Sequence, residues 1–143
     1  MQETTYKIPG LPCSLALLGD FHNGDPAPVL SSLRSHHPAL ICIIGDVFRY
    51  KDTTEGILMI HNQKNILPLL TGCVSIASTF LSLGNHERRL TEEDLSIIKK
   101  LGVTILDDEW ITATVSGKKL SIGGLTSHTV SNNRAIKGKI PGY

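Results

Sequence analysis

The chain has 143 residues, enough for one domain with a buried core, and its hydrophobic (41%) and charged (19%) fractions are ordinary for a globular protein. A net charge of +1 and an aromatic content of 5% argue against general affinity for nucleic acid or anionic membranes, and against stacking on single strands. With no apolar run of roughly 18 residues and no signal-peptide core, we expect a cytoplasmic protein without a membrane partner.

Three short apolar runs divide the first part of the chain, over residues 15–18, 40–44 and 79–83. Each run ends in a glycine that is followed by a polar side chain. Uninterrupted apolar runs of this length are typical of strands that are covered on both faces, as in parallel sheets. We therefore predict three parallel strands.

Two helices are predicted between these strands. Asp25 followed by a proline is typical of a helix start, and this helix should end before Pro38. A second helix is expected from about residues 54–55, with Pro68 breaking or kinking it, and residues 71–78 are ambiguous.

A third helix should begin at Thr91, where Thr91 and Asp94 resemble a capping box, and should end near Leu101. The pattern then changes to short strands, the last two joined as a hairpin around residues 116–118. These strands are expected over residues 103–106, 110–115 and 119–122.

The order of elements predicts an α/β fold in a single domain spanning residues 1–143. The polar segment 127–143 has no periodicity and is expected to be a loop or a disordered tail. In a parallel sheet, ligands bind beyond the carboxyl ends of the strands, so the residues that follow the three apolar runs are the candidate site.

Three motifs occupy those positions, namely Asp-Phe-His at 20–22, Gly-Asp at 45–46 and Gly-Asn-His-Glu at 84–87. Alone, each motif is weak evidence, because a glycine and an aspartate after a strand often form only a turn. Together and in this order, they offer the mixed oxygen and nitrogen ligands that divalent ions such as Mn, Fe or Zn accept. The candidate metal ligands are Asp20, His22, Asp46 and Asn85, and the candidate catalytic residue is His86.

With these motifs, residues 15–125 resemble the calcineurin-like metallophosphoesterase superfamily, in particular its small bacterial phosphoesterases. The resemblance implies an αββα sandwich and a hydrolase that cleaves phosphomonoesters or phosphodiesters with a hydroxide bridging two divalent ions. It places Asp20 and His22 on the first ion, Asp46 between both ions and Asn85 on the second. His86 would lie beside the scissile phosphate of the phosphate ester substrate, and nucleic acid would matter only as a small phosphodiester.

Two departures from the family pattern qualify this resemblance. Arg49 stands where the phosphoprotein phosphatases carry an aspartate, and the family's final Gly-His-x-His is missing, with His128 the only histidine after His86. The sequence therefore resembles a fold truncated after the first sheet and part of the second. Its exposed apolar face would need self-association or a complementing C-terminal segment.

Arg49, Arg88 and His128 are weaker candidates for contact with the substrate phosphate. Two alternatives to an active enzyme stay open. The chain could be an inactive truncated fragment, or it could be a binding scaffold of the same fold without catalytic activity.

Overall fold

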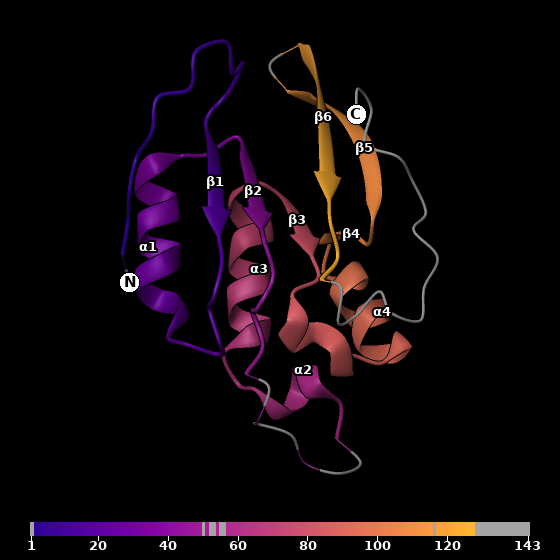
Figure 1. Ribbon diagram of the computed structural model, residues 1–143. Helices are drawn as coiled ribbons and strands as arrows, with labels where there is room; N and C mark the ends of the chain where they lie inside the picture. Colours follow the sequence, from indigo (N-terminus) through magenta and orange to yellow (C-terminus); the bar gives the residue numbers. More distant parts are fainter. Residues whose placement is uncertain (1, 50, 52–53, 55–56, 116, 128–143) are drawn as a thin grey trace.

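The computed structural model describes residues 2–49, 51, 54, 57–115 and 117–127. Its centre is a four-stranded sheet in the order β1-β2-β3-β4, beside which β5 and β6 form a two-stranded sheet (Figure 1). The strands are Leu15–Leu18 (β1), Leu40–Ile43 (β2), Ser78–Ser82 (β3), Thr104–Leu106 (β4), Glu109–Val115 (β5) and Lys118–Gly124 (β6). The helices are Pro26–His36 (α1), Met59–Asn62 (α2), Ile66–Ile76 (α3), the 3-10 helix Asn85–Arg89 (η1) and Glu92–Lys100 (α4).

The central sheet confirms the predicted α/β class. All three of its strand pairs are parallel, with Leu15 opposite Leu40 and Leu40 opposite Ser78. The hairpin is also as predicted, since β5 and β6 pair antiparallel up to Val115 opposite Lys118. The predicted tail lies outside the described residues from position 128 onward.

The first and last predicted helices begin as their capping residues indicated. The Asp25 carboxylate accepts a hydrogen bond of 3.0 Å from the backbone N–H of Ala27 at the start of α1. At α4, the Thr91 hydroxyl accepts from the backbone N–H of Asp94 at 3.1 Å, and the Asp94 carboxylate accepts from the Thr91 N–H at 2.9 Å. These bonds satisfy backbone donors that have no partner inside a helix.

The prediction of a second helix that starts near residues 54–55 and is broken or kinked at Pro68 is wrong in its start and in the place of its break. The structure has two helices, α2 and α3, and Pro68 lies in the first turn of α3, where its missing N–H removes no helical hydrogen bond. The chain breaks earlier, around Gln63 and Asn65. The Asn65 backbone and side-chain N–H groups donate to Asn23 at 3.1 and 2.9 Å, so a contact with a distant loop ends the first helix.

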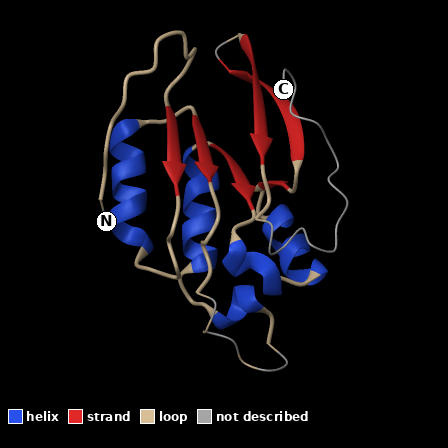
Figure 2. Ribbon diagram, viewed as in Figure 1, coloured by secondary structure: helices blue, strands red, loops and turns tan. Residues whose placement is uncertain are grey.

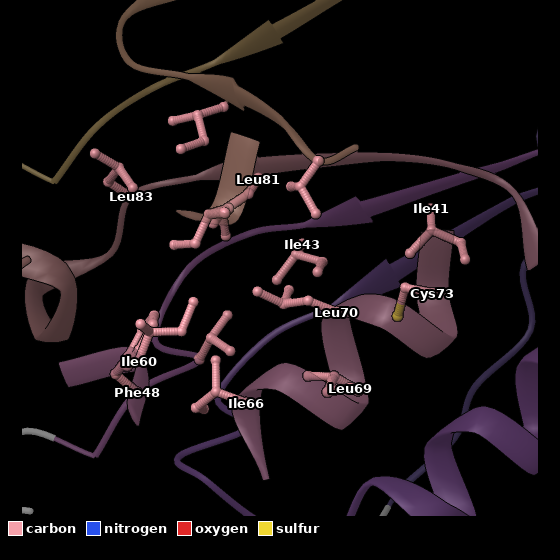
Figure 3. Packing of buried hydrophobic residues seen from close by; sticks show 14 of the residues in the cluster. Ile41, Ile43, Phe48, Ile60, Ile66, Leu69, Leu70, Cys73, Leu81 and Leu83 are labelled. Atoms are coloured by element: carbon pink, nitrogen blue, oxygen red, sulfur yellow. The ribbon is translucent and has the colours of Figure 1, made fainter. Parts of the chain in front are cut away.

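The two faces of the central sheet carry separate apolar clusters. Alternate strand residues such as Ile41, Ile43 and Leu81 pack against Leu70 and Cys73 of α3 (Figure 3). On the opposite face, Leu40, Phe80 and Leu106 pack against side chains of the hairpin, which Figure 2 shows set apart from α1 and α3. The sheet is thus a layer between the helices and the hairpin.

The hairpin leaves part of its side of the sheet uncovered. Leu17 and Ile44 continue the strand positions that face the hairpin side, yet their exposed fractions are 63% and 59%. Exposed apolar side chains that continue a buried apolar face are candidates for an interface. None of the helices in the described part of the chain is long and apolar enough to cross a membrane.

We expect this exposed pair to drive association, either with a second copy or with a complementing segment. Changing both Leu17 and Ile44 to Gln should shift the purified chain toward the monomer in size-exclusion chromatography with light scattering. The control is to replace Ser31 and Ser35, two exposed residues of α1, with Gln. A wild-type chain that is already a well-behaved monomer at high concentration would contradict the expectation.

Candidate metal centre

The carboxyl ends of β1, β2 and β3 point to the same end of the molecule, where η1 and α2 also lie (Figure 1). The loops that follow these strands are tied together by backbone hydrogen bonds. The N–H of His22 donates to the carbonyl of Asp46 at 3.0 Å, and the N–H of Asn23 donates to Val47 at 2.9 Å. The parallel sheet therefore brings the three sequence motifs to one edge.

Three of the predicted residues form a compact group at this edge. His22, Asp46 and His86 each offer one ligand atom, and these atoms all lie within 4.8 Å of one another. The two imidazole rings have their centroids 4.5 Å apart, at an angle of 48°. All three side chains are half-buried, so an ion bound among them would be partly shielded from solvent.

Both imidazole rings are held by one backbone carbonyl. Nδ1 of His22 lies 3.3 Å from the oxygen of Phe48, and Nδ1 of His86 lies 3.0 Å from the same atom. A carbonyl oxygen only accepts hydrogen bonds, so each ring donates its Nδ1–H to it. In the neutral ring this places the lone pair on Nε2, the state that a metal-binding histidine requires.

Asn85 and Asp20 lie next to this group. The amide of Asn85 faces the Asp46 carboxylate, and with its nitrogen turned inward it lies 3.2 and 3.1 Å from the two carboxylate oxygens. In this orientation the Asn85 amide donates to the Asp46 carboxylate. Asp20 is at the rim, because its carboxylate lies 3.7 Å from Nε2 of His22 and its side chain is 83% exposed.

The backbone at these positions is unusual for residues other than glycine. Asp20, His22 and Asp46 have φ angles of 54°, 47° and 55°, in the left-handed region. Such conformations are sparsely populated and concentrate at functional sites, where the surrounding contacts hold them. The three candidate ligands therefore share a backbone conformation that residues other than glycine rarely adopt.

Glu87 is the residue whose role the sequence did not reveal. It is 1% exposed, and its two carboxylate oxygens accept from the backbone N–H groups of Asp46, Val47 and Phe48 at 2.9, 2.8 and 3.2 Å. Burial raises its pKa, while the three backbone donors lower the pKa and the nearby Asp46 carboxylate raises it further. Glu87 thus fixes the loop that carries both Asp46 and the carbonyl of Phe48.

Two glycines allow this loop to approach η1. A Cβ at Gly45 would lie 2.6 Å from the Cα of Gly84. A Cβ at Gly84 would lie 2.5 Å from the backbone nitrogen of Asp46 and closer still to its carboxylate. These separations are shorter than any real Cβ contact, so the Gly-Asp and Gly-Asn motifs need both glycines for packing.

We expect Gly84→Ala to displace the Asp46 carboxylate and to weaken Mn²⁺ binding by at least about 10-fold, the range for residues that support metal ligands. Isothermal titration calorimetry measures the change. Gly10→Ala is the control, because Gly10 has a φ of 83° but nothing within 4 Å of its Cβ position, so it tests backbone strain without crowding. Equal metal affinity in wild type and Gly84→Ala would contradict the steric effect.

The candidate substrate residues lie around a cavity beside the same group. This cavity, of about 300 Å³, is lined by Arg49, Lys51, Asn85, His86 and Arg88. Lys51 was not among the predicted residues, and its position two residues after Arg49 is the only sequence signal for it. The predicted His128 lies outside the described residues.

The donors present fit a divalent transition metal. Imidazole nitrogen with carboxylate oxygen suits Zn, Mn or Fe, and the group offers both kinds of atom within one small space. The shared contact of both rings with Phe48 also matches the outer hydrogen bonds that orient metal-ligating histidines.

Comparison with known proteins gives a sequence relative and a structural neighbour, and no protein-family model matches the chain. The crystal structure of phosphopantetheinyl hydrolase from Mycobacterium tuberculosis superposes with a TM-score of 0.50 and 19% sequence identity, over 78% of this chain and 41% of that one. The chain shares the α/β fold of that hydrolase.

The sequence relative carries a different kind of name. A protein from Streptococcus suis (strain 05ZYH33) described as hydroxyethylthiazole kinase is 31% identical over 122 residues, which cover 78% of this chain and 45% of the relative. The chain therefore spans less than half the length of either protein.

Proposed function

We propose that this chain is a metal-dependent phosphoesterase of the calcineurin-like type, acting on a phosphomonoester or phosphodiester. The observation that carries the proposal is the convergence of His22, Asp46 and His86 at the carboxyl edge of the parallel sheet. The order of the three motifs and the fold shared with a hydrolase support it.

In this proposal His22 and Asp46 hold divalent metal, with Asn85 and the exposed Asp20 completing the sites for two ions such as Mn, Fe or Zn. Metal bound there would polarise a phosphoryl oxygen and lower the pKa of a water molecule. Asp46 contacts other residues of the site and is therefore suited to a position between the two ions. Its Oδ1 accepts the backbone N–H of His86 at 3.1 Å, and the Asn85 amide faces both carboxylate oxygens.

His86 is the proposed catalytic residue. Its ring adjoins His22 and Asp46 and also lines the cavity, so in this proposal its Nε2 is assigned to the substrate and the metal to the other ligands. Its Nδ1–H is engaged by Phe48, so Nε2 is the atom that would exchange a proton with the leaving oxygen.

The name of the Streptococcus suis relative favours a competing candidate, phosphoryl transfer from ATP to an acceptor other than water. The site argues for hydrolysis, because kinases hold Mg²⁺ through carboxylates and substrate phosphates and not through imidazole pairs. A catalytically inactive scaffold is the third candidate, and it would bind metal without turnover.

Hydrolysis of p-nitrophenyl phosphate and of bis(p-nitrophenyl) phosphate by the purified chain tests these candidates. We expect turnover that requires Mn²⁺, stops with EDTA and falls by about 10²- to 10⁴-fold in His86→Ala, the range for loss of a general acid. His61→Ala, at an exposed position of α2, is the control. Phosphorylation of hydroxyethylthiazole by ATP without ester hydrolysis would replace the proposal with the kinase candidate.

A further inference from the structure

Three cationic side chains meet at the cavity beside the candidate metal centre. Of the five residues that line this space of about 300 Å³, Arg49, Lys51 and Arg88 carry positive charge, and none of the five is a carboxylate. The other two lining residues, Asn85 and His86, belong to or adjoin the metal group. A molecule in the cavity would therefore meet both positively charged side chains and residues of the candidate metal centre.

This charge is local and is not a property of the whole surface. The chain has 14 Lys and Arg against 13 Asp and Glu, so its net charge is only +1. With charges nearly balanced overall, three cations are concentrated around one small cavity. Their field decays over about a Debye length, roughly 10 Å in ordinary buffer.

A buried neighbour anchors the backbone of Arg49, and Arg88 directly follows another buried residue in the chain. The N–H of Arg49 donates to the side-chain oxygen of Gln63 at 2.7 Å, and the Gln63 amide donates to the Arg49 carbonyl at 2.8 Å. Gln63 itself is 0% exposed. Arg88 directly follows Glu87, which holds the Asp46 loop. The Arg49 side chain thus starts from a fixed backbone position, and the Arg88 side chain starts next to a residue whose carboxylate is held by three hydrogen bonds.

We infer that this cavity selects a dianionic phosphoryl group, so that the preferred substrates are phosphomonoesters and not phosphodiesters. The inference rests on the proposed function and narrows its substrate class. A phosphomonoester carries a second negative charge near neutral pH, since its second pKa is about 6, whereas a diester carries one. Guanidinium groups also bind the free oxygens of a terminal phosphate in pairs, and a diester has fewer such oxygens.

Substrate preference tests this directly. We expect kcat/KM of the wild type to be higher for p-nitrophenyl phosphate than for its bis ester. In the double variant Arg49→Gln/Arg88→Gln, kcat/KM for the monoester should fall by at least about 30-fold, mostly through KM. For the diester, kcat/KM should fall by less than about 5-fold. The difference is expected because the loss of charged hydrogen bonds costs more binding energy with a dianion. Arg34→Gln, exposed on α1, is the control.

Binding of inorganic phosphate to EDTA-treated protein separates this inference from the proposed function. We expect calorimetry to show phosphate binding that the double variant weakens by at least about 10-fold and Arg34→Gln leaves unchanged. Phosphate binding of this kind in a chain without esterase activity would overturn the proposed function and keep the phosphate site formed by the two arginines. Equal losses with both esters, or phosphate binding that is insensitive to both arginines, would overturn the inference.

Discussion

Replacing Asp46 with alanine is expected to remove metal binding and to lower kcat/KM for ester hydrolysis by at least about 10³-fold. Asp46 is the carboxylate of the ligand group, and it also accepts the His86 N–H and faces the Asn85 amide. A bound metal stabilises the transition state by several kcal/mol. Each 1.4 kcal/mol of lost stabilisation lowers the rate about tenfold. Steady-state kinetics at saturating Mn²⁺ measure the effect.

The matched control removes an exposed aspartate elsewhere. Asp25→Ser deletes the carboxylate at the start of α1 but keeps a side chain that can cap the helix, so activity should stay within about twofold of wild type. If Asp46→Ala kept a tenth or more of the wild-type kcat/KM, Asp46 would not be a ligand of a catalytic metal.

Glu87→Ala is expected to lower the free energy of unfolding by about 3–5 kcal/mol, because each buried donor left without an acceptor costs about 1–3 kcal/mol. The change leaves three backbone N–H groups without the acceptor that now binds them. Glu87→Gln should cost about 1–3 kcal/mol, because one of its oxygens becomes a donor that faces a backbone donor. Urea denaturation measures both values.

Glu93→Ala serves as the reference for Glu87, because Glu93 is exposed in the first turn of α4 and its loss should change stability by no more than about 0.5 kcal/mol. Stability of Glu87→Gln equal to that of wild type would show that the Asp46–Phe48 loop does not depend on this carboxylate. The position of Asp46 would then need another cause.

The central sheet and the place of the candidate site could be predicted because they follow from local patterns. Each apolar run ends at a glycine, and the next polar residue reaches the carboxyl edge wherever parallel strands pair. The capping residues Asp25 and Thr91 act within their own helices, so they also marked real helix starts.

What the sequence did not reveal depends on contacts between distant segments. The break between α2 and α3 follows from the bonds of Asn65 to Asn23, 42 positions away, and not from Pro68. Both histidine rings are oriented by the backbone carbonyl of Phe48. Every residue type has such a carbonyl, so the sequence does not indicate this contact. Glu87 stood within a motif, but its role follows from the hydrogen bonds that its buried carboxylate accepts from the Asp46–Phe48 loop.

Metal binding by the intact chain is the decisive measurement. X-ray absorption of the Zn²⁺-loaded protein should show imidazole and carboxylate scattering. Titration with Zn²⁺ should show saturable binding that is lost in Asp46→Ala, weakened in His22→Ala and unchanged in His61→Ala. A wild-type chain with no saturable site for Zn²⁺ or Mn²⁺, or with affinity that is indifferent to Asp46 and His22, would contradict a metal centre at this edge of the sheet.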